Sequence, residues 1–472
     1  MKASDERGVA LVMVLILMGV ISVLGASLVL VSQTETWSSQ NYRLMTEARY
    51  GAESGAHKAA DFLMDTSRYT APGSSTFGST YTITTSPVKY GSDPVVLSST
   101  GSGSNYPSST VVTNYTDAVH GTLTSGTDPV TYDAIATLVS MRAFILYGSA
   151  TPVTIQTWKI VGRGTIGGAK PARIEVETIL ERQVQPVFSY AAFATDNGCG
   201  ALTWYGNSRT DSYDSGALSG GNPVISATGG NVGTNGNLNI YGNADIGGTL
   251  STPRVGVGAC SAGAVTAITG SLSAIDGLSE LPQSVSYPLP DPPTPLSSTP
   301  FACNNSVLPP GAYGDITCGA NKTLHLTQGT YNINSITLNG QGSIVVDSGP
   351  AILNVAGYAT AGTFEAVPSM ADPIVLQGGS TMNVTGYDPS MFQITYRGSH
   401  TVTMMGNSGF AGLLYAPNST WVNGGTPDWY GAVIARTVRD YGAAKIHYDR
   451  RLSMDALAAG PWMIDSFSWK KM

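Results

Sequence analysis

Histidine and cysteine, the residues that most often bind metals or act as nucleophiles, are few in this 472-residue chain. Its five histidines show no paired ligand spacing such as HxxxH, and no CxxC occurs, so the sequence contains no zinc-site pattern. The GxSxG sequence of acyl-transfer enzymes and the Walker loop of nucleotide sites are also missing. We therefore expect a protein that is not an enzyme and that holds no metal or cofactor.

Carboxylates could still serve an enzyme of the polysaccharide-lyase type, which needs clustered acidic residues for calcium and a base that removes a proton. In the C-terminal part of the chain, the close acidic pair is Asp211 and Asp214, within a stretch rich in serine and glycine. Aspartate in such stretches commonly bonds to the backbone two residues on, as an Asx turn. We interpret the pair as part of a solvated loop.

Binding through positive charge is a stronger alternative, because basic residues are concentrated near the C-terminus of a chain whose net charge is −7. These residues are Arg436, Arg439, Lys445, Arg450 and Arg451. If they share a face, they could contact phosphates during DNA uptake. The other interpretation is that they are solvated and paired with Asp440 and Asp449.

Aromatic residues near expected loops offer a different kind of binding. Trp421, Trp429 and Tyr430 could stack on sugars in an adhesin, or they could simply fill the protein interior. The sequence leaves three roles open for this region: a polysaccharide-binding adhesin, a DNA receptor and a passive structural subunit.

Four cysteines indicate one or two disulfides in a secreted protein. They are Cys199, Cys260, Cys303 and Cys318, and the sequence does not choose among their three pairings. Between the second and third lies a segment, residues 281–300, with seven prolines. Proline cannot occupy central strands, so we expect this insert to be an extended crossing or a surface loop.

The elements that position these residues begin with a helix. Residues 9–32 form an apolar run of 24 residues without a charge. At 1.5 Å per residue the run spans about 36 Å, enough for a hydrocarbon core of roughly 30 Å. From residue 33 to 66 no proline occurs, and a stripe that begins at Trp37 and continues with leucine and alanine recurs at helical spacing. We therefore predict one transmembrane and stalk helix over 9–66.

The residues around the apolar run carry a family resemblance. The leader of residues 1–8 is short and polar and ends in Gly8 directly before Val9, and so resembles prepilin leaders. Beyond the run, Glu35, Asn41 and the stretch YGAESG at 50–55 resemble the N-terminal segment of PilX-type minor pilins. The competing interpretation is an unrelated membrane-anchored surface protein.

The resemblance implies a pathway of maturation and assembly. A prepilin peptidase would cut between Gly8 and Val9, and the new N-terminus would be methylated. The single helix would hold the chain in the inner membrane, with the bulk periplasmic or extracellular, until it joins other pilins in a filament. Major pilins carry glutamate as fifth mature residue, where this chain has Met13. This departure reflects either family drift or a special position such as the tip. Pilus and secretion pseudopilus are not distinguished.

The rest of the chain predicts two β-rich parts. Charged residues make up only 12% and glycine is abundant, which favours short strands and tight turns over long surface helices. Residues 67–190 contain a hairpin pattern, 158–164 with 174–180, which resembles the antiparallel sheet of a pilin head. Residues 191–472 show turns about every six residues and a repeat, 410–417 with 429–436, offset by 19.

A 19-residue repeat matches one coil of a parallel β-solenoid. The closing run, 431–449, resembles that of bactofilin-like β-helix domains. A β-sandwich is the alternative for this region. The predicted fold class is therefore α+β: a long N-terminal helix, a small pilin-like β-sheet head and a large C-terminal parallel β-solenoid.

Overall fold

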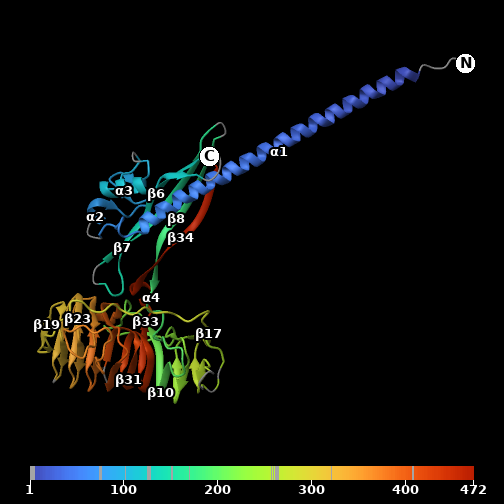
Figure 1. Ribbon diagram of the computed structural model, residues 1–472. Coiled ribbons are helices and arrows are strands. Elements are labelled where there is room, and N and C mark those ends of the chain that lie inside the picture. The colour runs from blue at the N-terminus through green and yellow to red at the C-terminus, as the bar shows by residue number, and fades with distance from the viewer. Residues whose placement is uncertain are drawn as a thin grey trace. The chain divides into compact units, whose positions relative to one another are not determined.

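The computed structural model describes residues 6–73, 77–100, 103–124, 129–149, 152–168, 171–256, 258, 260, 265–319, 321–406 and 409–471. The chain forms two compact units, which are described separately (Figure 1). Unit 1 contains residues 1–143, 154–183 and 461–472, and unit 2 contains 144–153 and 184–460. The last residues of the chain thus belong to unit 1, although the sequence places them with the preceding β region.

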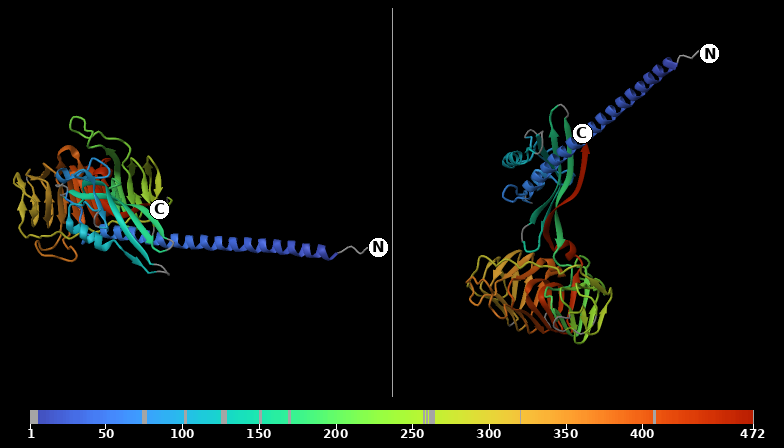
Figure 2. Two further views of the ribbon diagram at one scale, coloured as in Figure 1. Left: turned by 90° about the horizontal axis from the view of Figure 1, so that it is seen from above. Right: turned by 45° about the vertical axis from the view of Figure 1, so that its right-hand side comes forward.

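Unit 1 is organised by helix α1 (Glu6–Met64), which is continuous over 59 residues (Figure 2). This confirms the long N-terminal apolar helix that the sequence predicts. Its C-terminal part packs on a sheet, with alanines such as Ala48, Ala52 and Ala56 fully buried. The predicted stripe therefore holds from Leu44 onward. Trp37, which the pattern includes in the stripe, is instead 58% exposed.

The main sheet of unit 1 combines distant parts of the chain. Its strand order is β34 (Leu457–Lys471), β8 (Ala172–Pro186), β7 (Pro152–Ile166), β6 (Val130–Ile145) and β4 (Val96–Ser98), with β5 (Gly121–Leu123) paired to β6. Strands β7 and β8 are antiparallel, with Gly162 opposite Val176, so the predicted hairpin is confirmed. The smaller elements are α2 (Phe77–Thr80), β1 (Tyr81–Thr82), β2 (Lys89–Tyr90), β3 (Asp93–Pro94) and α3 (Ser109–Ala118).

Unit 2 consists of many short strands that follow one another in successive turns of the backbone. We call each such turn a coil, and unit 2 the coil domain. The N-terminal series is β9 (Ala192–Ala194), β10 (Leu202–Tyr213), β11 (Val232–Thr234), β12 (Leu238–Ile240), β13 (Asn243–Ile246), β14 (Leu250–Thr252), β15 (Ile268–Thr269), β16 (Leu272–Ala274) and β17 (Leu278–Glu280). The second series begins with β18 (Phe301–Ala302), β19 (Ser306–Leu308), β20 (Gly311–Ala312), β21 (Asp315–Cys318), β22 (Thr323–Leu326), β23 (Gly329–Ile333), β24 (Ser335–Leu338) and β25 (Ser343–Val346). It continues with β26 (Ala351–Val355), β27 (Ile374–Leu376), β28 (Thr381–Val384), β29 (Phe392–Tyr396), β30 (Thr401–Gly406), β31 (Gly409–Gly425), β32 (Asp428–Gly442) and β33 (Lys445–Asp449), before α4 (Leu452–Asp455).

Strands three apart in the sequence pair in parallel, so the chain returns to the same face after each coil. Strand β22 pairs with β25, which pairs with β28, all in parallel register. The parallel sheet predicted for the C-terminal region is therefore confirmed. A sandwich of antiparallel sheets, the alternative, does not fit this pairing.

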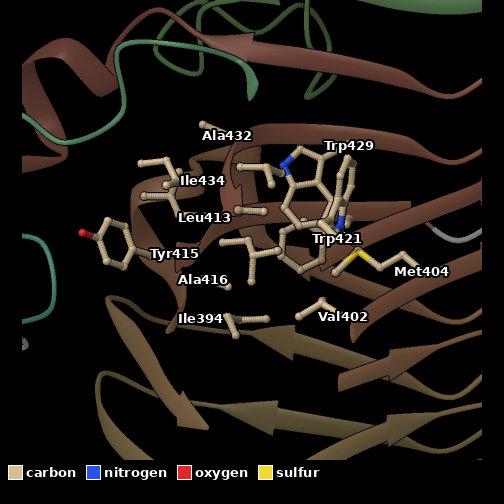
Figure 3. Packing of buried hydrophobic residues seen from close by; sticks show 14 of the residues in the cluster. Ile394, Val402, Met404, Leu413, Tyr415, Ala416, Trp421, Trp429, Ala432 and Ile434 are labelled. Carbon is tan, nitrogen blue, oxygen red and sulfur yellow. Dashed lines mark hydrogen bonds between the residues drawn. The ribbon is translucent and has the colours of Figure 1, made fainter. Parts of the chain in front are cut away.

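The 19-residue offset corresponds to the register of β31 with β32, where Phe410 lies opposite Trp429. Their rings stack inside the coil with centroids 3.7 Å apart, and Trp421 meets Trp429 edge to face at 5.4 Å. Figure 3 shows these tryptophans among aliphatic side chains of neighbouring coils. The repeat thus places equivalent apolar side chains one above another in a shared interior.

The two series of coils meet in the middle of the stack, because β10 pairs with β32 as well as with β12. Figure 1 accordingly shows β19 and β17 towards opposite ends of the row. The proline-rich insert connects these ends. It is held to the coils on the way: Asn235 bonds to the backbone of Val285, and Tyr415 donates to the carbonyl of Pro288. No strand or helix occurs between Glu280 and Phe301, all of which is described.

Candidate functional site

The N-terminal half of α1 is the largest exposed apolar surface in the described chain. Its large apolar side chains between Val9 and Val31 are 48–71% exposed. The most apolar 18-residue window has a mean hydropathy of 2.8 and none of it is buried, and the helix is long enough to cross a membrane. Exposed apolar patches of this size indicate a lipid or protein contact. Membrane anchoring is the contact that the length of the run suggests.

The residues predicted for cleavage and filament packing all lie on this helix. Gly8 is in its first turn and Val9, which follows, is 62% exposed. Residues 1–5 of the expected leader lie outside the described residues. Met13 is 68% exposed, and Glu35 and Asn41 are exposed as well. These side chains are therefore accessible to a neighbouring molecule, although they are spread along the helix and form no single cluster.

The other half of α1 is positioned by close contact with glycines on β7. A Cβ atom added to Gly162 would overlap the backbone of Ala52, and one added to Gly164 would overlap the backbone of Ala48. The facing helix residues are small, so helix and sheet backbones approach each other closely. The C-terminal half of α1 therefore packs on its own sheet, whereas the N-terminal half remains exposed.

The five basic residues are distributed along β32, β33 and the turn into α4. Three of them have carboxylate partners: Arg436 lies 4.0 Å from Asp196, Lys445 lies 3.8 Å from Asp428, and Arg451 lies 3.0 Å from Asp455. Arg439 and Arg450 are exposed. The partners differ from those expected, because Asp440 and Asp449 are themselves buried. Three of the five basic residues are thus each paired with a carboxylate, which offsets their charge.

Arg436 and Asp196 also line a polar cavity of about 420 Å³ in unit 2. The proline-rich insert contributes residues 284–287 to its wall, and Asn235 lines it as well. The lining residues offer hydrogen-bond donors and acceptors, but the positive charge of Arg436 is offset by the negative charge of Asp196. The cavity is therefore suited to a small polar group rather than to a strongly charged one.

The acidic pair is divided by the structure. The Asp214 carboxylate accepts a hydrogen bond from the Gly216 amide at 2.8 Å, as an Asx turn should. Asp211, by contrast, is in β10, is 2% exposed and is bonded to the ring of His447. The interpretation of Asp211 as part of a solvated loop is therefore wrong. Among the residues that the structure describes, no group of three His, Cys, Asp or Glu residues could hold a metal.

The cysteines form two disulfides, Cys199–Cys260 and Cys303–Cys318. The first joins residues 61 positions apart in the N-terminal series of coils, and the second joins residues only 15 positions apart. Cys260 and Cys303, which flank the proline-rich insert, are not joined to each other. The insert is thus held by hydrogen bonds and packing rather than by a covalent bridge across it.

Two of the three aromatic residues suggested for ligand stacking are interior residues, and the third, Tyr430, is half-buried. Trp421 is fully buried and Trp429 is 2% exposed, while Tyr430 stacks on His447 with ring centroids 4.5 Å apart. The suggestion that the two tryptophans stack on a sugar is therefore wrong. They fill the coil because their positions alternate inward along the strands.

A different set of aromatic residues is on the surface. Tyr205 lies between Tyr441 and Tyr241, with ring centroids 4.7 Å apart and planes 9° apart on both sides. We call these three residues the tyrosine row. Tyr241 is 64% and Tyr441 is 42% exposed. The signal that could have found them is a Tyr-Gly dipeptide, which occurs at all three positions and marks the same corner of each coil.

In comparisons with known proteins, the N-terminal segment and the coil domain match two different family models. Residues 7–56 match a family model described as PilX N-terminal. The N-terminal segment is type IV pilin-like. A second family model, described as a domain of unknown function (DUF7305), matches residues 304–454 of the coil domain. The competence-associated pilin ComZ from Thermus thermophilus is a similar solved structure, at 14% identity over 91% of this chain and 98% of that chain, with a TM-score of 0.23. No curated protein matches the sequence.

Proposed function

We propose that this chain is a minor pilin-like or pseudopilin-like subunit of a type IV pilus or a related filament, with a structural rather than an enzymatic role. One observation carries the proposal. The pilin-like segment, residues 7–56, folds as part of one helix whose first half is exposed and whose second half is buried on its own sheet. Such a helix can pass from lipid to a bundle of like helices while its head stays folded.

Maturation follows from the same helix. In the proposal, prepilin peptidase cuts between Gly8 and Val9, the new amino group is methylated, and the apolar run stays in the inner membrane until assembly. The bulk of the chain is then periplasmic or extracellular. Other pilins are the partners, and they cover the side chains around Met13, Glu35 and Asn41. The exposure of all three side chains supports this assignment.

The coil domain is, in this proposal, a bactofilin-like parallel β-solenoid presented for contact with a surface. Its size favours a tip position, because a domain of residues 184–460 repeated at every subunit would crowd a filament shaft. Met13 supports the same position. A carboxylate there would need a neighbouring partner to offset its desolvation, and a subunit at the tip has a neighbour on one side only.

The test is the location of the full chain in cells that make filaments. Sheared filaments should contain the chain at low copy number, and immunogold against the coil domain should label filament ends. A Gly8→Leu variant, which cannot be processed, should stay in the membrane fraction. If the unaltered chain also stays in the membrane of filament-forming cells, the subunit proposal is rejected and a plain membrane anchor remains.

A further inference from the structure

The tyrosine row is most exposed at its Tyr241 end, where the ring is 64% exposed, compared with 42% for Tyr441 at the other end. In register with Tyr441, the neighbouring coil carries Gly424, and the Met405 side chain of the coil beyond lies against this glycine, with its Cγ 3.4 Å from where a Cβ atom at Gly424 would be. At the other end, Gly270 has φ +105 and lies against the backbone of Ile240, next to Tyr241. The Tyr441 end of the row therefore lies next to Met405, whereas the Tyr241 end lies next to a glycine. A planar or flat ligand can reach the exposed Tyr241 ring.

Amide groups follow the row on the same corner. Asn207 and Asn243 come two residues after Tyr205 and Tyr241, both are exposed, and Asn243 donates to the Asn207 oxygen at 3.0 Å. A side-chain amide has two N–H donors and an acceptor oxygen, so this pair keeps capacity for further hydrogen bonds. The corner thus combines apolar ring faces with neutral donors and acceptors.

Charge around the row is nearly balanced. Two of the nearby cations have carboxylate partners, since Arg209 lies 3.6 Å from Asp211 and Lys445 lies 3.8 Å from Asp428, while Arg439, two residues before Tyr441, is a single exposed cation. Asp245, in register with Arg209 on the next coil, adds a negative charge. A nucleic acid needs several cations along its path, because phosphate contacts supply most of its affinity. The surroundings of the row do not provide such a path.

We propose that the tyrosine row, with Asn207 and Asn243, binds a neutral glycan chain. The C–H face of a pyranose ring is apolar and packs on an exposed tyrosine ring, while its hydroxyl groups exchange hydrogen bonds with the amides. Tyrosine supplies this contact area with little loss of side-chain entropy, because the stacked rings are already ordered. The assignment concerns a site of unit 2 and does not depend on assembly into a filament.

The competing explanation is purely structural: the stack could only stabilise the contact between coils. Titration calorimetry of the full chain, in a detergent without a sugar headgroup, separates the two. The probes are maltoheptaose, cellohexaose, chitohexaose and a twelve-residue oligothymidylate. We expect saturable binding of at least one neutral sugar. Raising the salt from about 50 to about 200 mM should leave its affinity unchanged, because no phosphate contact is involved.

Variants locate the binding. Tyr241→Leu removes an exposed ring and should weaken sugar binding about tenfold, whereas Tyr241→Phe keeps the ring and should retain it. Phe364→Leu is the matched control, because Phe364 is also an exposed aromatic residue of unit 2, at 58%. Unfolding midpoints confirm that each variant is folded.

Three results would overturn the proposal. One is that none of the sugars binds saturably. Another is that sugar binding is the same in Tyr241→Leu as in the unaltered chain. The third is that the oligothymidylate binds instead, with an affinity that depends on Tyr241 and falls with salt. In that case the row would be a nucleic-acid site.

Discussion

Gly164 of strand β7 faces the backbone carbonyl of Ala48 on helix α1 so closely that a Cβ atom at Gly164 would overlap the carbonyl oxygen. Ala48 is fully buried in this contact. The spacing between helix and sheet therefore depends on the absence of one side chain. Because the same helix carries the pilin-like segment, the contact also fixes where the exposed half of the helix leaves unit 1.

Gly164→Ala should loosen the helix from its sheet. The added methyl group cannot be placed without moving backbone, so we expect a loss of about 2 kcal/mol in the free energy of unfolding. Hydrogen exchange over residues 44–64 measures the effect directly and should become faster. Gly167→Ala is the matched control, because a Cβ at Gly167 meets nothing within 4 Å. Equal exchange in both variants would show that the contact is not limiting.

Stability of the coil domain should depend on the protonation of Asp440. This side chain is 4% exposed, and burial raises its pKa from the usual 3.8 to about 6. The folded state therefore binds more protons than the unfolded state between these values. The free energy of unfolding attributable to Asp440 falls as the pH rises through this range, and the penalty is complete above about pH 6.

Asp440→Asn removes the buried charge and should stabilise the chain at pH 7 by about 3 kcal/mol. The gain should nearly vanish at pH 4, where the carboxyl group is largely neutral in the folded state. Urea unfolding at the two pH values measures this difference. Asp245→Asn, at an exposed position, should change stability little at either pH. A gain for Asp440→Asn that is the same at both pH values would contradict the assigned cause.

Patterns with a strict period were readable from the sequence. The apolar run and the alanine stripe determine α1, and the offset between Phe410 and Trp429 predicts their parallel register. What these patterns define is which side chains share a buried face. They therefore lead reliably to the helix, the hairpin of β7 with β8, and the parallel sheet.

Contacts between residues that are distant in the sequence could not be predicted from the sequence. Asp211 appears in the sequence as a loop residue, yet its burial depends on His447, more than 200 positions away. The direction of Trp421 and Trp429 was equally open, because an aromatic residue next to a turn suits either face of a strand. Nor does local sequence indicate that β10 joins two series of coils and so brings Tyr205 and Tyr441 together.

Processing should require Gly8. Gly8→Leu should leave residues 1–8 on the chain, because the proposed peptidase cuts after a small residue at the membrane surface. Intact-mass measurement of the membrane-extracted protein should show the longer chain for the variant and a chain that begins at Val9 for the unaltered protein. Gly19→Leu serves as a control inside the apolar run, since a side chain there meets nothing within the described monomer. Residues 1–8 retained in the unaltered protein would argue against a prepilin leader.

Position in the filament should respond to Met13. Met13→Glu supplies the carboxylate that major pilins carry at the fifth mature position. If its absence confines the subunit to the tip, the variant should enter the shaft, and gold label against the coil domain should move away from filament ends. Met18→Glu places the same charge elsewhere on the exposed half of α1 and controls for charge alone. Label spread evenly along filaments of the unaltered protein would reject the tip position.

The chain returns to unit 1 through β34, next to β8, and this connection affects the resistance of the protein to proteolysis. Residues 184–460 leave unit 1 at one strand of its sheet and re-enter at the neighbouring strand. A single nick in residues 184–460 therefore leaves the N-terminal fragment continuous with most of unit 1 and the C-terminal fragment continuous with β34, which is held in the sheet beside β8. The nicked fragments also stay side by side, because each coil is paired with those before and after it. Loss of the C-terminal fragment after one cut requires both the pairing between coils and the pairing of β34 with β8 to break.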